Sequence, residues 1–195
     1  MSGADAGLVL AGGRARRMGG VDKALVDFDG EPLGARVCRR FRPQVSALAV
    51  AGAMRPGFPA EVAWLDDGAF AGLGPLAGIL AGLRWAAGRG AMNLATVPVD
   101  VPFLPPDLAE RLATTDRLAF AAVAGRTHWA IGRWPVDLAD ALQAHLAGAR
   151  DRSVRGFADV CGFGEVAFGP GDPFFNVNTP EDLDEARRRS GAAVR

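Results

Sequence analysis

The chain has 195 residues, of which 49% are hydrophobic and 23% charged, and its 22 basic and 22 acidic residues leave no formal net charge. This length and composition are typical of one globular domain with a substantial core, so we expect residues 1–195 to form a single domain. The zero net charge gives no indication of general binding to nucleic acid or to a membrane. Any basic site in this protein therefore has to be local.

The cysteines and the first residues indicate the compartment. Cys38 and Cys161 are too few and too far apart for a disulfide framework or a zinc site, and they fit a reducing environment. No apolar run approaches the length of a membrane span, and the first residues lack the features of a signal peptide. We expect a cytoplasmic protein that has frayed termini at residues 1–5 and about 188–195.

Strand and helix patterns alternate along the chain. In order, they predict a strand at 7–11, a helix at 33–41, strands at 46–51 and 62–65, a helix at 76–87, a strand at 93–99, a helix at 105–113, strands at 118–123 and 129–133, and helices at 137–147 and 153–161. A last helix starts at Thr179, a candidate N-cap, with Pro180 in its first turn. This alternation favours an α/β fold with a mostly parallel sheet.

A basic, glycine-rich stretch follows the first strand. It contains Gly12, Gly13, Arg14, Arg16, Arg17, Gly19, Gly20 and Lys23. Glycines let backbone N–H groups converge on an anion, and arginine and lysine supply the matching charge, so the stretch predicts a loop around nucleotide phosphates. Its spacing is neither that of a P-loop nor that of a dinucleotide-binding fingerprint. A surface loop made basic for solubility is the alternative.

Acidic residues follow two other predicted strands. Asp100 comes directly after the strand at 93–99, and Mg²⁺ prefers one or two carboxylates together with phosphate oxygens and water. The alternative is that Asp100 only caps the loop before Pro102. Asp66 and Asp67 follow the strand at 62–65, although Asp-Asp-Gly is also an ordinary turn sequence. Because ligands bind outside the carboxyl ends of parallel strands, these acids and the glycine-rich stretch are expected to converge on one edge.

The motifs resemble those of a known family. Residues 10–23 carry Leu10-Ala11-Gly12-Gly13, Arg17-Met18-Gly19-Gly20 and Asp22-Lys23, which closely resemble the signature of the molybdenum cofactor guanylyltransferases. The similarity continues, in the expected order, through residues 74–78, 100–108 and 176–183. It implies a Rossmann-like, three-layer fold. The implied reaction transfers GMP from GTP to the terminal phosphate of molybdopterin, usually already carrying molybdenum, and releases pyrophosphate.

The resemblance also implies roles for individual residues. Contacts to the nucleotide are implied for Leu10, Ala11, Gly12, Gly13, Lys23, Asp67 and Asp100, and Asp100 is implied to hold Mg²⁺, with Mn²⁺ as an alternative. The expected catalytic residues are Lys23, Arg17 and Asp100. Lys23 would offset charge at the α-phosphate, and Arg17, with Arg14 as a second candidate, would hold the pyrophosphate.

Two further residues are candidates on the acceptor side, and one family feature is missing. Asn178 is a candidate for a second metal or for the acceptor phosphate, against a simple role in capping and turn formation. Arg155 is a candidate for the pterin phosphate, against a solvated helix face. The family usually has an asparagine at the end of the second strand, where this chain has Ala51, or Gly52 if the alignment shifts by one.

Three other functions stay open at this point. A cytidylyltransferase acting on the same cofactor would differ in its nucleotide, and a sugar-phosphate nucleotidyltransferase in its acceptor. A non-catalytic nucleotide-binding protein that delivers the cofactor is the third, although intact Lys23 and Asp100 argue against it. Besides GTP and molybdopterin, the expected partners are proteins that deliver molybdopterin or mature molybdoenzymes.

Overall fold

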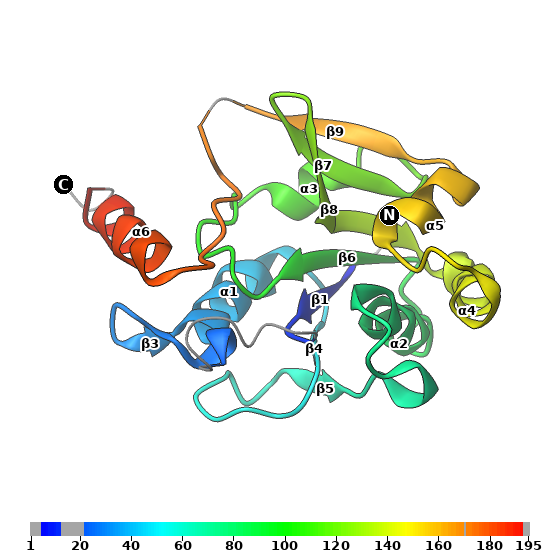
Figure 1. Cartoon of the computed structure of the whole chain (residues 1–195), viewed down its shortest axis with the longest axis horizontal. Helices are drawn as coiled ribbons and strands as arrows, with labels where there is room; N and C mark the ends of the chain where they lie inside the picture. Colours follow the sequence, from blue (N-terminus) through cyan, green and yellow to red (C-terminus); the bar gives the residue numbers. More distant parts are fainter. Residues whose placement is uncertain (1–4, 13–21, 170, 193–195) are drawn as a thin grey trace.

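A seven-stranded sheet crosses the middle of the molecule in the computed structural model, which describes residues 5–12, 22–169 and 171–192 (Figure 1). The strand order is β5-β4-β1-β6-β8-β7-β9. The strands are β1 (Ala6–Leu10), β4 (Leu48–Ala51), β5 (Ala63–Leu65), β6 (Asn93–Pro98), β7 (Ala119–Val123), β8 (Arg126–Pro135) and β9 (Gly164–Phe168). Among these strands β8 alone runs antiparallel to its neighbours, β6 and β7. The mostly parallel sheet is confirmed.

Strand β1 is central because apolar residues cover both of its faces. It pairs in parallel with β4 on one side and β6 on the other, and all five of its residues are buried. Leu8 and Leu10 belong to one apolar cluster, and Val9 belongs to the other. This alternation follows from the two-residue period of a strand, so one short apolar run anchors both cores.

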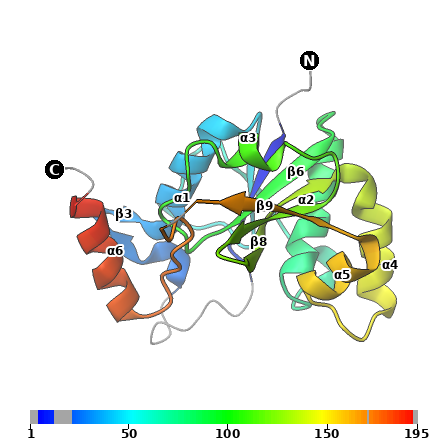
Figure 2. The same ribbon diagram turned by 90° about the horizontal axis from the view of Figure 1, so that it is seen from above.

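Helices cover both faces of the sheet, which confirms the three-layer arrangement (Figures 1 and 2). One face packs against α2 (Pro75–Ala87), α4 (Ala139–Gly148) and α5 (Val154–Cys161). The opposite face packs against α1 (Leu33–Phe41) and α3 (Leu108–Leu112). No helix in the described part of the chain is both long and apolar enough to span a membrane.

A small third apolar cluster joins the segment at residues 28–33 to the segment at residues 177–186. The hairpin of β2 (Asp27–Phe28) and β3 (Glu31–Pro32) turns through Asp29 and Gly30, both at positive φ. It packs with α6 (Pro180–Ala192), which lies to one side of the sheet beside β3 and α1 (Figure 1). The shared buried residues are Phe28, Leu33, Val177, Leu183 and Ala186. This packing brings the segment before α6 next to the short 3-10 helix η1 (Lys23–Leu25).

Several predicted boundaries need correction. Helix α3 begins at Leu108 rather than at 105, because Asp107 has non-helical backbone angles and Leu108 N–H closes a turn onto the Pro105 carbonyl. Strand β8 is longer than the predicted 129–133, and β9 was not predicted. Helix α1, in contrast, has the predicted bounds, and Pro43 lies just beyond it in the first turn of 3-10 helix η2 (Arg42–Gln44), which a proline tolerates.

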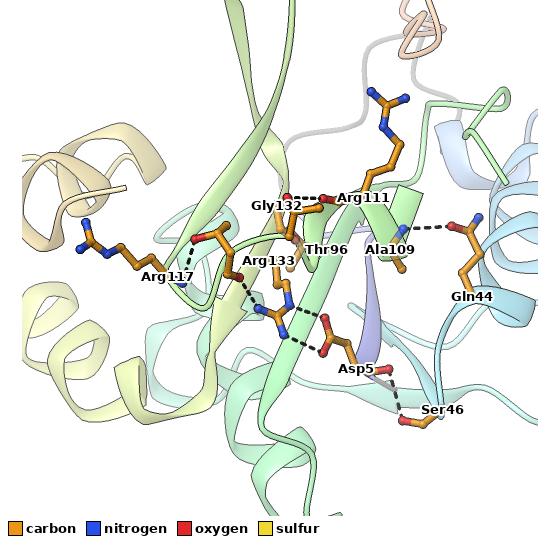
Figure 3. A network of polar contacts seen from close by, with 11 residues as sticks. Asp5, Gln44, Ser46, Thr96, Ala109, Arg111, Arg117, Gly132 and Arg133 are labelled. Carbon is orange, nitrogen blue, oxygen red and sulfur yellow. Dashed lines mark hydrogen bonds and ion pairs between the residues drawn. The ribbon is translucent and has the colours of Figure 1, made fainter. Parts of the chain in front are cut away.

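Two residues within the ranges expected to fray, Asp5 and Ser190, have defined partners in the described chain. Asp5 is buried, with 7% of its side chain exposed, and it forms a two-pronged ion pair with Arg133, whose side chain is 3% exposed (Figure 3). At the other end, α6 stays helical to Ala192, and Arg36 from α1 donates a hydrogen bond to Ser190. Residues 1–4 and 193–195 lie outside the described residues.

Candidate active site

Lys23, Asp100 and Asn178 meet at the carboxyl end of β6 although they lie far apart in the sequence. The Lys23 ammonium group donates to Asp100 Oδ2 at 3.3 Å and to the side-chain oxygen of Asn178. Only 8% of the Lys23 side chain and 17% of the Asp100 side chain are exposed. A buried ammonium group needs such partners to offset its lost hydration. The structure therefore brings together three residues that the sequence had singled out separately.

Local structure fixes the backbone of Lys23. Asp22 is the N-cap of η1, has extended backbone angles, and accepts a hydrogen bond from Ala24 N–H at 3.1 Å through Oδ1. Leu25 N–H donates to the Asp22 carbonyl at 2.9 Å. A side-chain cap of this kind satisfies a donor that the first turn leaves free. The Lys23 side chain consequently extends from a backbone turn of defined conformation rather than from an open loop.

Asp100 is held by backbone contacts on both sides. Val99 N–H donates to the Leu10 carbonyl at 3.1 Å, and Val177 N–H donates to the Asp100 carbonyl at 2.9 Å. Its Oδ1 atom is buried and has no hydrogen-bond partner among the described residues. A buried carboxylate oxygen without a donor fits a bound cation. The described residues contain no group of three or more metal-ligating side chains, which suits Mg²⁺ held by one carboxylate, phosphates and water.

A capping box at the start of α6 orients Asn178. Asp182 Oδ2 accepts hydrogen bonds from the backbone N–H groups of Asn178 and Thr179, both at 2.9 Å, and Thr179 Oγ1 accepts one from Asp182 N–H at 3.1 Å. This reciprocal arrangement fixes the entry of the helix. The capping is done by Thr179 and Asp182, which leaves the Asn178 side chain to contact Lys23.

A small cavity of about 20 Å³ lies beside the end of β1. Its lining residues are Leu10, Gly12, Ala51, Asp67, Gly74, Pro75 and Gly78. The lack of a side chain at Gly78 lets α2 approach β4, because a Cβ atom there would lie 2.8 Å from the Ala51 Cβ. The cavity thus lies where α2 packs directly against β4, at the edge of the sheet that is predicted to bind the nucleotide.

The two neighbouring aspartates have different roles. Asp66 Oδ1 accepts a hydrogen bond from Gly68 N–H at 2.7 Å, which is the ordinary turn-forming role. Asp67 lines the cavity, and within the part of the chain that the structure describes its buried Oδ1 atom has no partner. Burial, helped by the negative charge of Asp66, raises the pKa of Asp67. Asp67 thus places beside the cavity a carboxylate oxygen that could accept a hydrogen bond from a ligand.

The missing asparagine has no substitute side chain in this region. Ala51 is 1% exposed and packs against α2, so a larger residue has no space there. Gly52 follows with φ +127°, a conformation that disfavours residues with a Cβ, and its N–H donates to the Leu65 carbonyl at 2.8 Å. Neither position offers an amide group to a ligand.

Some predicted site residues do not join this cluster. Gly13, Arg14, Arg16 and Arg17 lie outside the described residues. Arg155 is 71% exposed and pairs with Asp159 one turn along α5 at 3.6 Å, which fits the solvated helix face that the sequence left open.

Sequence reasoning missed Arg55, which contacts the cluster from the loop after β4. Its guanidinium group donates to Asp22 Oδ2 at 2.6 Å, to the Ala11 carbonyl at 3.1 Å and to the Ala53 carbonyl at 2.9 Å. Two of these partners are backbone carbonyls, which every residue has, so the sequence does not reveal these contacts. The only signal in the sequence was a lone arginine after a strand that ends at the binding edge.

The fold and the lysine–carboxylate site are those of a nucleotidyltransferase. The family model of the MobA-like NTP transferase domain matches residues 7–160, and the chain belongs to this family. It is 46% identical over 182 residues to the molybdenum cofactor guanylyltransferase of Acidiphilium cryptum, with 92% of each chain covered. The corresponding protein of Cereibacter sphaeroides is 47% identical over 193 residues, covering 92% of this chain and 94% of that one. The resemblance drawn from the motifs is confirmed.

Solved structures share the fold at low identity. Molybdopterin-guanine dinucleotide biosynthesis protein A from Archaeoglobus fulgidus has a TM-score of 0.74 and 21% identity, covering 96% of this chain and 99% of that one. A nucleotidyl transferase from Methanothermobacter thermautotroptrophicus has a TM-score of 0.74 and 19% identity, covering 97% and 99%. These neighbours establish the architecture of the sheet and its helices.

Proposed function

We propose that this protein transfers GMP from GTP to the terminal phosphate of molybdopterin, with or without bound molybdenum, and releases pyrophosphate. The observation that carries the proposal is the contact of Lys23 with Asp100 and Asn178, beside a cavity lined by Asp67. The relatives named as molybdenum cofactor guanylyltransferases support the choice of both substrates. Proteins that supply molybdopterin or mature molybdoenzymes are the proposed partners, and the cytoplasm is the proposed compartment.

The reaction brings two anions together. An oxygen of the molybdopterin phosphate attacks the α-phosphorus of GTP, a new P–O bond forms, and the bond from the α-phosphorus to the bridging oxygen of pyrophosphate breaks. The attacking phosphate is already ionised at neutral pH, so no general base is needed. Positioning and neutralisation of charge then supply most of the acceleration.

Lys23 is the side chain best placed to neutralise that charge. Its ammonium group is buried and already directed by Asp100 and Asn178, so it is oriented before the substrate arrives. Preorganised charge of this kind costs no rearrangement during the reaction. We assign Arg17, with Arg14 as a second candidate, to the pyrophosphate, on the resemblance alone.

Asp100 is the proposed ligand of Mg²⁺. One of its oxygens faces Lys23, and the buried Oδ1 atom has no donor in the described structure. When bound, the ion would neutralise charge on the phosphates. Mn²⁺ also accepts carboxylate and phosphate oxygens and would fit the same donors.

On the nucleotide side of the site, backbone groups and one carboxylate group are available to contact GTP. We assign contacts with GTP to Leu10, Ala11, Gly12, Gly13 and Asp67. An ionised carboxylate only accepts hydrogen bonds, so the free Asp67 oxygen calls for an N–H or O–H group of the nucleoside. Asn178 is assigned to the acceptor phosphate, with a second metal as the alternative, because its side chain contacts Lys23.

A nucleotide panel tests the proposal. Purified protein is mixed with molybdopterin and GTP, CTP, ATP or UTP, with Mg²⁺ or with a chelator, and pyrophosphate release is measured. We expect release with GTP that stops when the metal is chelated. Preference for CTP would identify a cytidylyltransferase, release only with a sugar phosphate would change the acceptor, and no release with any pair would favour a binding protein.

A further inference from the structure

We infer that Arg55 is a positioning residue that holds Lys23 in place by tying together three chain segments at the nucleotide edge. The catalytic part of this inference rests on the proposed function. The guanidinium group of Arg55 is already engaged by Asp22 and by two backbone carbonyls, so its effect would pass through Lys23 rather than through contact with GTP.

The contacts of Arg55 reach three separate segments. The guanidinium group pairs with Asp22 in front of η1 at 2.6 Å, with the carbonyl of Ala11 after β1 at 3.1 Å, and with the carbonyl of Ala53 after β4 at 2.9 Å. Only 15% of the Arg55 side chain is exposed. These contacts fix the separation between Ala11 and Asp22, the residues near the two ends of the glycine-rich stretch.

Asp22 passes this restraint on to Lys23. Its Oδ2 atom accepts from Arg55, while its Oδ1 atom accepts from Ala24 N–H, and Lys23 lies between Asp22 and Ala24. Both carboxylate oxygens are therefore engaged, and the plane of the carboxylate is fixed. Rotation of this carboxylate would break the cap of η1 and release the turn that carries the lysine.

The neighbouring glycine makes room for the guanidinium group. A Cβ atom on Gly52 would lie 3.3 Å from Arg55 Nη1 and 3.5 Å from the Ala11 carbonyl oxygen, and the φ of Gly52 is +127°. A side chain at this position would crowd the Arg55–Ala11 contact. Arginine suits the task because its planar group presents several donors in a fixed geometry, whereas a lysine presents one compact charge.

The test is a cycle of variants measured with GTP and molybdopterin. We expect Arg55→Ala to lower kcat by about 10- to 100-fold, since a misplaced catalytic group can cost that much. The KM for GTP is expected to change by less than about threefold, because the Arg55 guanidinium group is already engaged by Asp22 and two backbone carbonyls. Arg55→Lys should recover part of the loss. Arg39→Ala, which removes an arginine paired with Glu31 away from this edge, is the matched control and should leave kcat unchanged.

The decisive comparison uses the Lys23→Ala background. If Arg55 acts through Lys23, Arg55→Ala should lower kcat by less than about twofold once Lys23 is absent, because coupled residues are not additive. An undiminished loss in that background would overturn the inference. If Arg55→Ala does not fold by circular dichroism, Asp22→Asn replaces it: this variant keeps an oxygen for Ala24 N–H and loses the charge that Arg55 pairs with. A normal kcat for Asp22→Asn would equally overturn the inference.

A measurement without turnover separates this inference from the proposed function. Arg55→Ala should speed hydrogen exchange of the Ala24 and Leu25 amides by more than about tenfold while leaving the amides of central β1 protected. Unchanged exchange at Ala24 would refute the role of Arg55 whatever the activity. Faster exchange in a protein that transfers no nucleotide would leave the restraint intact and refute the proposed function alone.

Discussion

At the scale of residues, the candidate site contains buried carboxylate oxygens that would be expected to form hydrogen bonds if their role were only structural. Within residues 5–12, 22–169 and 171–192, Asp67 and Asp100 each bury one carboxylate oxygen that has no hydrogen-bond partner. Burying a polar atom in this way costs stability, and native structures rarely do so without a reason. Both atoms lie at the edge where the nucleotide and the metal are proposed to bind, so their missing partners are the expected positions of ligand groups.

Replacing Lys23 tests the centre of the site. Lys23→Ala removes the one ammonium group that contacts both Asp100 and Asn178. Losing one preorganised group that stabilises transition-state charge costs about 10²- to 10³-fold in kcat, and we expect a loss of that size. Pyrophosphate release measures the rate, and circular dichroism checks that the fold is intact. Near-normal turnover in a folded variant would contradict the assignment.

The raised pKa of Asp67 predicts how stability depends on pH. The folded state disfavours the ionised carboxylate, so Asp67 lowers stability once the pH rises above the unfolded pKa of about 3.9, and this cost grows until the pH passes the raised folded pKa. Asp67→Asn removes the charge. The Tm of this variant relative to the wild type should therefore increase from acidic to neutral pH, as measured by calorimetry. A difference in Tm that does not vary with pH would contradict this explanation.

The amino-acid sequence indicated most of the residues of the candidate site but not the contacts that hold them in position. Lys23, Asp67 and Asp100 could be predicted because each follows a recognisable strand or motif. Arg55 could not, because the carbonyls of Ala11 and Ala53 are partners that any residue provides. The motifs assigned only Asp67 to the nucleotide, and the structure adds the physical difference: Asp66 accepts a hydrogen bond from Gly68 N–H, whereas Asp67 lines the cavity.

At the scale of elements, buried segments were easier to predict than exposed ones. β1 and α1 coincide closely with the predicted segments, since continuous apolar runs and helical spacing are strong signals. β9 escaped prediction because it is an edge strand with only one fully buried residue and a glutamate within it. The start of α3 was misplaced since Pro105 and Pro106 suit a turn as well as a first helical turn.

The close approach of α2 and β4 gives a prediction for this element pair. In Gly78→Ala the new methyl would lie 2.8 Å from the Ala51 Cβ and 3.3 Å from Asp67 Oδ1. Overpacking of this kind costs about 1–3 kcal/mol, and moving α2 outward should also weaken binding of GTP. Urea unfolding and calorimetry of GTP binding measure the two effects.

Gly148 in α4 is the matched control for that substitution. An added Cβ at Gly148 has no atom within 4 Å, so Gly148→Ala should be neutral or stabilise the helix by about 0.5–1 kcal/mol. Equal effects of the two substitutions would show that α2 adapts to the extra methyl group and that its packing does not shape the cavity.

At the scale of the whole molecule, the sheet and its layers followed from the alternation of patterns, whereas the state of the termini did not. Asp5 pairs with Arg133, which lies 128 positions away, and Ser46 donates to the Asp5 carbonyl. No local pattern can show a partner so distant. A residue in a short polar terminus therefore looked free in the sequence although it belongs to the buried polar network of Figure 3.

Breaking this ion pair should destabilise the entire fold. Asp5→Ala leaves Arg133 buried beside β6 without its charge partner, and removal of one member of a buried pair costs about 3–5 kcal/mol. Thermal unfolding measures the loss. Asp184→Ala, which removes an exposed partner of Arg187, should cost at most about 1 kcal/mol and serves as control. Similar losses would show that the buried pair contributes no more than a surface one.

The contact between Lys23 and Asn178 spans 155 positions, which has a consequence for the protein during its synthesis. A ribosome makes the lysine early and the asparagine late, and domains form their contacts as the chain emerges. Strands β1, β4 and β6 can pair beforehand, yet the lysine lacks one of its two side-chain partners until residue 178 has left the exit tunnel. The complete cluster therefore forms only after residue 178 has emerged, and a nascent chain that stalls before that residue would not contain it.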